Sequence, residues 1–165
     1  MIKGSKAMIE TINQYSKTFK EPIRKSRTSC RGIVIKDNKI LLVHELNKDV
    51  YMSPGGGVEQ GESFEQCCRR EFMEEVGLDV SVGEHLFTMN EYVYDELFIS
   101  NYFLCEVVGV GEMALTPTEI DHGVTPEWVD IEKAIEIFSH YKEKTPDHES
   151  LYLREYTVLN KYLEK

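Results

Sequence analysis

Three glutamates in one short segment carry the clearest chemical signal in the sequence. Glu71, Glu74 and Glu75 fall within about a 100° arc of one face if residues 64–76 form a helix. Like charges at this spacing each destabilise a helix by roughly a few tenths of a kcal/mol, so a compensating positive charge is expected. Arg70 can neutralise part of the charge. A hard divalent cation suits the rest, either Mg²⁺ or, as the alternative, Mn²⁺.

A run of three glycines, Gly55 to Gly57, precedes these glutamates. Backbone without side chains can turn freely and bring a carbonyl or an amide close to the same site. Taken alone, a triglycine is more often a flexible turn, and the sequence EEVG is more often a solvated helix end. Their fixed separation favours one shared site, and a cation site beside a glycine run is typical of phosphate chemistry.

The limits of the helix that presents the glutamates can also be predicted. Ser63 and Gln66 match a capping box, which places the first helical residue at about Phe64. Gly77 supplies the left-handed residue that ends the helix. Apolar residues at four-residue spacing predict its buried face, and these are Phe64, Cys68, Phe72 and Val76.

This pattern resembles the complete Nudix box of the MutT-like hydrolases, because every polar position of that motif is filled. The one departure is Phe72, where the family usually carries an aliphatic residue, and the small neighbouring Cys68 leaves room for the ring. The matching positions are Gly56, Glu62, Arg70, Glu71, Glu74, Glu75, Gly77 and Leu78.

The resemblance implies an α/β fold of the α+β kind, namely an α/β/α sandwich with a mixed β-sheet between helices. It implies hydrolysis of a diphosphate bond in a nucleoside diphosphate linked to another moiety. The implied metal ligands are the carbonyl of Gly55 and the carboxylates of Glu71, Glu74 and Glu75, which are also the implied catalytic residues. The residues implied to support the site are Gly56, Glu62, Arg70 and Gly77.

The general base is left open between two residues in the stretch TPTEIDHGVTPEW. In several relatives a loop glutamate shortly before a tryptophan-bearing strand serves this role, and counting back from Trp128 the position holds His122. Glu119 lies three residues earlier. A histidine has an ordinary pKa near 6.5 and can accept a proton at neutral pH, whereas a lone loop histidine is more often solvated. Glu119 and His122 therefore rank equally.

A second hypothesis of another class is a catalytically inactive Nudix-fold module that binds or senses nucleotides. Such proteins usually lose glutamates of the box, and this sequence keeps them. An isomerase of isoprenyl diphosphates would need a separate catalytic cysteine, and Cys67 and Cys68 lie inside the box helix. Rings at Tyr92, Tyr94, Phe98 or Tyr102 could stack on a nucleobase, although alternation in a strand is commonly ordinary packing.

Composition limits the remaining classes. With 165 residues and 41% hydrophobic residues, the chain is long enough for one domain with a real core. A formal net charge of −10 disfavours binding to a nucleic-acid polymer, so a nucleotide-type small molecule is the expected partner. The sequence has no apolar run of membrane-spanning length and no signal-peptide pattern, so a cytoplasmic location is expected. All of the cysteines are expected to be buried reduced thiols.

Periodicity predicts the elements of the remaining segments. Met8, Ile12, Tyr15 and Phe19 predict an amphipathic helix, which gives an N-terminal helical extension over residues 1–25 before a Nudix domain over 26–165. This helix could support a homodimer or pack within the chain, so the oligomeric state is left open. Further predictions are a hairpin turning at Asp37-Asn38, strands between residues 80 and 108, a strand at Trp128-Val129, and helices from Ile131 and from about Ser150.

Overall fold

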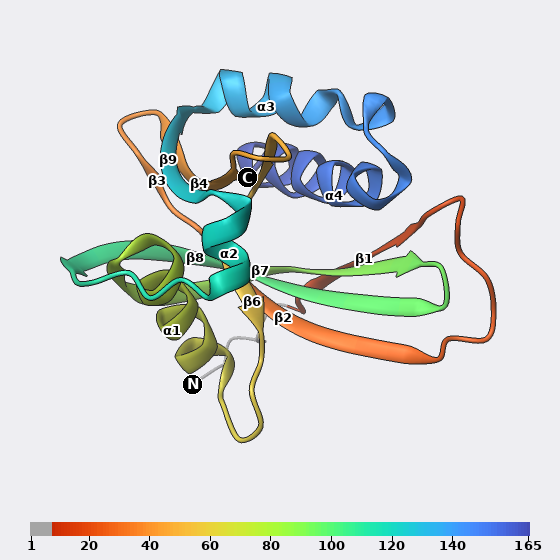
Figure 1. Ribbon diagram of the computed structural model, residues 1–165, viewed down its shortest axis with the longest axis horizontal. Coiled ribbons are helices and arrows are strands. Elements are labelled where there is room, and N and C mark those ends of the chain that lie inside the picture. The colour runs from red at the N-terminus through yellow and green to blue at the C-terminus, as the bar shows by residue number, and fades with distance from the viewer. Residues whose placement is uncertain (1–7) are drawn as a thin grey trace, which may run out of the picture.

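The computed structural model describes residues 8–165 and consists of two sheets flanked by helices (Figure 1). In chain order the strands are β1 (Glu10–Tyr15), β2 (Lys25–Ile33), β3 (Ile35–Lys36), β4 (Lys39–Glu45), β5 (Val50–Met52), β6 (Gly55–Gly57), β7 (Leu78–Val93), β8 (Glu96–Val110) and β9 (Val124–Asp130). The helices are α1 (Phe64–Val76), α2 (Pro117–His122), α3 (Ile131–Ser139) and α4 (Pro146–Leu163), with a 3₁₀ turn η1 at Tyr141–Glu143.

The larger sheet has the spatial order β1-β7-β8-β2-β6. Strands β7 and β8 form a long antiparallel hairpin, and β6 is antiparallel to β2. Strand β1 runs parallel to β7, and β2 runs parallel to β8. The prediction of a mixed sheet is therefore confirmed, and it places the glycine strand β6 at an edge of that sheet.

The smaller sheet is built around β4, which pairs antiparallel with β3, β5 and β9. The predicted hairpin is confirmed: Asp37 and Asn38, at the turn between β3 and β4, have φ of 51° and 61°. Positive φ at both central residues suits the type of two-residue turn that matches the twist of paired strands. The β9 strand extends well beyond the predicted Trp128 and Val129.

Two apolar cores lie on the two sides of the sheets, which is the layered arrangement predicted. On one side, α1 contributes Phe72 to a cluster with Cys30 and Val80. On the other side, α4 contributes Tyr152 and Leu159 to a separate cluster. Figure 1 shows α1 on one side of the sheets and α3 with α4 on the other. Helices on both sides bury both faces of the sheets, as the α/β/α sandwich requires.

The predicted N-terminal helix is wrong for the described part of that segment. Residues 10–15 form β1, an extended strand that continues the larger sheet beyond β7. The residues that predicted an apolar helical stripe do not share a buried face, because Met8 and Tyr15 are exposed. The side chain of Gln14 is buried instead and donates to the carbonyl oxygen of Ser150 at 2.8 Å. The backbone edge of β7 offers hydrogen bonds that override the local helical spacing.

Two further expectations about composition can be compared with the structure. Within the described residues Cys30, Cys67, Cys68 and Cys105 are all buried and unpaired, which confirms the reading of reduced thiols. Among the helices that the structure describes, not one has the length and apolar character that a membrane crossing demands.

Candidate active site

The helix α1 begins and ends where the sequence predicts. The hydroxyl of Ser63 accepts a hydrogen bond from the backbone N–H of Gln66 at 3.1 Å, and the Gln66 side chain accepts one from the N–H of Ser63 at 2.9 Å. At the other end Gly77 has φ of 68°, and its N–H donates to Met73. These caps fix the rotation of the helix, so its acidic face is presented toward β6.

The glycines of β6 face alternate sides, and each side is too crowded for a side chain. A Cβ atom on Gly56 would lie 2.5 Å from a carboxylate oxygen of Glu71. A Cβ atom on Gly55, whose φ is +150°, would lie 2.1 Å from the carbonyl oxygen of Cys30. The absence of side chains on these glycines therefore lets the acidic face of α1 approach the backbone of β6 closely. The three glycines form a strand and not a flexible turn.

Arg70 connects the acidic face of α1 to the loop before it. Its Nε and Nη2 donate to the two oxygens of Glu62 at 2.7 and 3.0 Å, and Nη2 also donates to the carbonyl oxygen of Gly57 at 3.0 Å. Its Nη1 donates to Glu71 at 2.8 Å and to Glu74 at 3.2 Å. The hydrogen bonds from Arg70 lower the pKa of Glu62 to about 2. One guanidinium thus holds the loop, the glycine strand and two glutamates together.

Two carboxylates that face β6, Glu75 and Glu71, bind their protons more tightly than usual. Glu75 is only 7% exposed, and its Oε1 accepts a hydrogen bond from the N–H of Gly55 at 2.9 Å. Burial raises the pKa of Glu75 to about 8. Burial also raises the pKa of Glu71, against the lowering effect of Arg70, while the charges of Glu74 and Glu119 raise it further. The positive charges of Arg70 and Arg31 therefore do not fully offset the burial of these two carboxyl groups.

The two candidate bases, Glu119 and His122, have different neighbours. Glu119 lies on α2, a short helix that begins with a capping box in which the Glu119 side chain accepts from the N–H of Thr116 at 2.9 Å. Its charge reaches both buried glutamates and contributes to raising their pKa. His122 lies at the end of α2 with its Nδ1 3.8 Å from Glu45. Of the two, Glu119 is the one electrostatically coupled to the acidic cluster.

The acidic cluster matches a hard cation in its donor chemistry, although its side chains point to protein partners. Within residues 8–165 no group of three or more His, Cys, Asp and Glu side chains is arranged to hold a metal ion. In this arrangement Glu71 and Glu74 are turned to Arg70, and Glu75 is turned to the N–H of Gly55. The available donors are carboxylate and carbonyl oxygens, which Mg²⁺ and Mn²⁺ prefer. The raised pKa of the buried pair indicates that added positive charge would be favourable.

A buried polar network behind β6 was not predicted from the sequence. The Glu155 carboxylate on α4 accepts from the N–H of Ser53 at 2.9 Å and from its hydroxyl at 2.7 Å. The carbonyl oxygen of Ser53 accepts from Nη1 of Arg31 at 2.9 Å. Ser53 is two residues before Gly55, so α4 anchors the start of the glycine strand. No local pattern links residues so far apart in the sequence, and these contacts needed the structure.

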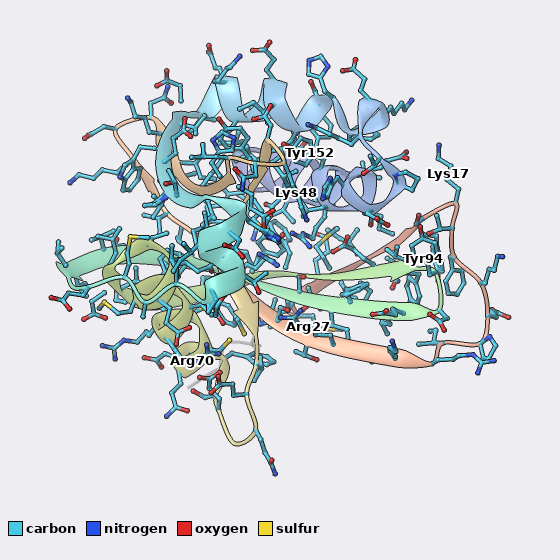
Figure 2. The ribbon with its side chains drawn as sticks, in the orientation of Figure 1. Lys17, Arg27, Lys48, Arg70, Tyr94 and Tyr152 are labelled. Carbon is cyan, nitrogen blue, oxygen red and sulfur yellow. The ribbon has the colours of Figure 1, made fainter. Side chains whose placement is uncertain are left out.

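A second unpredicted feature is a set of arginines on the other side of β6. Figure 2 shows Arg70 on the α1 side of the strand and Arg27 on the β2 side. Arg27 and Arg31 belong to β2 and are four residues apart, so they lie on the same face of that strand. This even spacing within a strand is the one sequence signal that could have placed the pair together.

Comparison with known proteins agrees with this geometry. The NUDIX domain model matches residues 26–154. An ADP-ribose pyrophosphatase of Methanocaldococcus jannaschii is 34% identical over 122 residues, covering 64% of this chain and 72% of its own. An m7GpppN-mRNA hydrolase of Saccharomyces cerevisiae is 28% identical over 132 residues, but the match spans 75% of this chain and only 12% of that protein.

Solved structures share the fold. A NUDIX hydrolase from Nitrosomonas europaea superposes with a TM-score of 0.58 at 20% identity, with 80% of this chain and 88% of that chain covered. Because the domain match extends over most of the sequence and includes both the glycine strand and the acidic helix, the chain belongs to the Nudix family of hydrolases.

Proposed function

We propose that this Nudix hydrolase cleaves the diphosphate bond of a nucleoside diphosphate linked to another moiety, with Mg²⁺ as cofactor or Mn²⁺ in its place. The observation that carries the proposal is the gathering of Glu71, Glu74 and Glu75 against a strand of bare glycine backbone. The Methanocaldococcus relative, named for cleavage of ADP-ribose, supports the same type of bond.

The cation would be held by the carboxylates of Glu71, Glu74 and Glu75 together with the carbonyl oxygen of Gly55. This oxygen-only set suits a hard cation, and two of its members have a raised pKa because they are buried beside other negative charges. When bound, the cation supplies neutralisation of the diphosphate oxygens and a lower pKa for the attacking water.

The surrounding residues keep these carboxylates in position. Glu62 fixes Arg70 through two hydrogen bonds, and Arg70 in turn holds Glu71 and Glu74 in place through Nη1. Glu75 holds α1 against β6 through the N–H of Gly55. Among the three carboxylates Glu74 is the most accessible, since its side chain is 40% exposed, so it is best placed to orient a water molecule as well.

For the general base we favour Glu119 over His122. The negative charge of Glu119 adds a smaller contribution to the raised pKa of Glu71 and Glu75, for which burial is the main cause, and this supports a place for Glu119 beside the acidic cluster. His122 lies beside Glu45. If Glu119 is the base, Glu119→Gln removes the acidic limb of the pH–rate profile, whereas His122→Asn leaves that limb in place. The opposite outcome would assign the base to His122.

The substrate is proposed to be a small nucleotide. The net charge of −10 opposes binding to a nucleic-acid polymer unless a basic surface compensates. The yeast relative named as an mRNA hydrolase shares only a small part of its length with this chain. The family membership and the charge together favour nucleoside diphosphates carrying a sugar, a second nucleotide or another small group.

The test is a panel of such nucleotides incubated with Mg²⁺ or Mn²⁺, with the products identified by mass. We expect hydrolysis that disappears on chelation and falls by orders of magnitude in Glu71→Gln, Glu74→Gln and Glu75→Gln. The matched control is Glu84→Gln, which removes an exposed glutamate far along β7 that pairs with Lys165. Nucleotide binding with no turnover of any substrate would instead support an inactive binding module.

A further inference from the structure

On the side opposite the acidic helix, the glycine strand lies against two arginines of β2 that line a cavity of about 300 Å³. Successive residues of a strand face opposite sides, so Gly56 faces Glu71 while Gly55 and Gly57 face the other way. A Cβ atom on Gly57 would lie 3.0 Å from Nη2 of Arg27. β6 is therefore a thin backbone wall with carboxylates on one side and arginines on the other.

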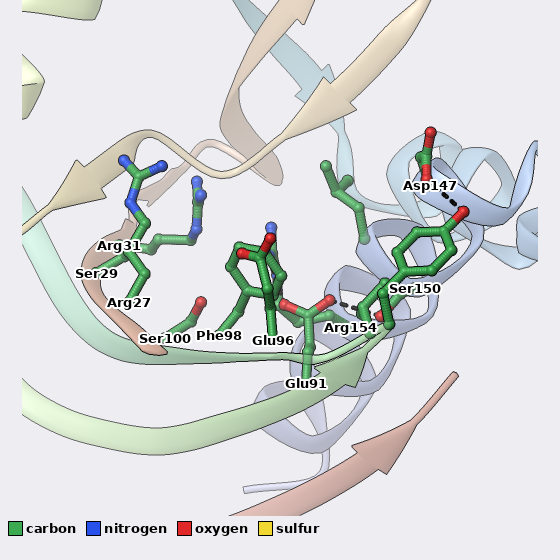
Figure 3. A pocket seen from close by; sticks show the side chains of 13 residues that line it. Arg27, Ser29, Arg31, Glu91, Glu96, Phe98, Ser100, Asp147, Ser150 and Arg154 are labelled. Carbon is green, nitrogen blue, oxygen red and sulfur yellow. Dashed lines mark hydrogen bonds and ion pairs between the residues drawn. The ribbon is translucent and has the colours of Figure 1, made fainter. Parts of the chain in front are cut away.

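The arginines converge because of the period of β2. Residues 27, 29 and 31 lie on one face of that strand, and all three line the cavity. In the antiparallel pairing Arg31 is opposite Gly55 and Ser29 is opposite Gly57. With no side chain on either glycine, both guanidinium groups can reach the space beside the strand. Figure 3 shows Arg27 and Arg31 together at one end of the cavity.

These two cations have no carboxylate partner among residues 8–165, although the chain carries a net charge of −10. Arg31 donates to the carbonyl oxygen of Ser53, and its Nε is buried without a hydrogen-bond acceptor in the described part of the chain. Arg154, deeper in the same cavity, is fully compensated in charge by Glu91 at 2.7 Å and Glu155 at 3.2 Å. Nε of Arg154 likewise has no acceptor in the described part of the chain, so the distinguishing feature of Arg27 and Arg31 is their unbalanced charge. Two guanidinium groups without a carboxylate, one with an unsatisfied buried donor, favour binding of an anion at this end.

The far end of the cavity has a different character. The hydroxyl of Tyr94 lies 3.3 Å from Asp147, and Figure 3 places Asp147 and Ser150 away from the two arginines. Ser100 and Glu96 also line the cavity. Carboxylates and hydroxyls of this kind accept hydrogen bonds from ligand hydroxyl groups. The volume of the cavity is near the lower limit for ligand pockets in proteins and suits a single ring.

On the basis of the proposed function, we infer that Arg27 and Arg31 bind a phosphate of the substrate, and that the hydroxylated ring attached to this phosphate occupies the cavity. The diphosphate then crosses the free edge of β6, since that strand ends the sheet. One phosphate lies toward the acidic cluster and the other between the two guanidiniums. Arg27 and Arg31 are thus substrate-binding residues, and the ring is either a sugar or the ribose of a nucleoside.

The test measures binding in metal-free buffer, so that it does not depend on turnover. The probes are ribose 5-phosphate, AMP, inorganic phosphate and unphosphorylated adenosine, titrated by calorimetry. We expect at least one of the first two to bind more tightly than inorganic phosphate and adenosine. We expect Arg27→Gln to weaken that binding at least about tenfold, because it removes a charge-assisted contact. The tighter of the two probes identifies the ring.

Two variants control for charge and folding. Arg69→Gln removes an arginine on α1 that pairs with Asp79 at 3.1 Å, and it should leave probe binding unchanged. Arg31→Lys keeps the charge and loses the planar fork, and it should weaken binding less than Arg27→Gln if it folds. Since Arg27 is exposed, its substitution is not expected to disturb folding.

The outcomes separate this inference from the proposed function. If no phosphorylated probe binds, or if Arg27→Gln binds the probes as the wild type does, the inference is wrong even when nucleotides are hydrolysed. If the probes bind through Arg27 but no nucleotide is hydrolysed with Mg²⁺ or Mn²⁺, the proposed function fails and the anion site remains. With an active substrate, Arg27→Gln should raise KM more than it lowers kcat if the contact is already made in the ground state.

Discussion

Gly56→Ala tests whether bare backbone in β6 sets the position of the carboxylates that we propose to be catalytic. The added Cβ atom would lie 2.5 Å from Oε1 and 2.6 Å from Cδ of Glu71. Ordinary contacts of this type begin at 3.4 Å, so the Glu71 carboxylate must move by about 0.9 Å. The backbone of Gly56 is in a region that alanine adopts without strain, because its φ is not positive. The perturbation is therefore confined to Glu71.

The expected effect is on turnover more than on stability. A misplacement of about 1 Å costs roughly 10²-fold in rate, which corresponds to about 2.7 kcal/mol in the activation free energy. The fold should be preserved, since glycine-to-alanine changes at compatible positions shift stability by only about 1 kcal/mol or less. We therefore expect kcat/KM to fall about 10²-fold with little change in Tm.

The measurement combines steady-state kinetics with thermal unfolding of the same samples. Gly109→Ala is the matched control, because its Cβ atom would meet nothing closer than Cβ of Asp79 at 3.6 Å, on the far part of β8. Magnesium titration of both variants shows whether cation affinity falls together with turnover. Full activity in Gly56→Ala would refute the reasoning, since it would mean that Glu71 acts from a position that the strand does not constrain.

Three other outcomes are expected. Without metal, Glu75→Gln should become more stable than the wild type as pH rises from about 4.5 toward 8, because the raised pKa makes ionisation of the buried Glu75 destabilising over that range. Denaturant melts should show a difference in the free energy of unfolding of up to a few kcal/mol at pH 8. Equal stability of the two proteins at that pH would contradict the burial argument. Glu91→Ala should lower the free energy of unfolding by about 3 kcal/mol, because it removes the shorter ion pair of the buried Arg154 and leaves Glu155 alone to balance that charge, and a loss below about 1 kcal/mol would show that the pair is dispensable. Arg70→Lys should lower turnover with the fold intact, because lysine cannot bind both oxygens of Glu62, and wild-type kinetics would exclude the proposed bracing.

The sequence was most informative where the determinants of structure are local. The limits of α1 follow from Ser63, Gln66 and Gly77, which act within one turn of the helix. The glycine run and the acidic face were correctly placed beside each other because a motif of fixed spacing specifies both. The turn at Asp37-Asn38 is likewise decided by two adjacent residues that tolerate positive φ.

Long-range contacts limited the prediction elsewhere. The spacing of apolar residues in the N-terminal segment predicts a helix, whereas the structure of residues 10–15 is decided by the open edge of β7. The α2 helix is a different case, because the capping box at Thr116 and Glu119 is a local signal that could have predicted it. The cavity could not be foreseen, because it is closed by β2, β8 and α4, which come from distant parts of the chain.

The added strand β1 and the last turns of α4 have a practical consequence for anyone who trims this protein to the boundaries of the matched domain. A fragment of residues 26–154 would match the domain model and yet lack β1, which leaves the backbone edge of β7 open for pairing with other molecules. The same cut would remove Val158 and Leu159 from the interior. Expression of such a fragment should give aggregated material, whereas boundaries at residues 8 and 165 keep the edge covered.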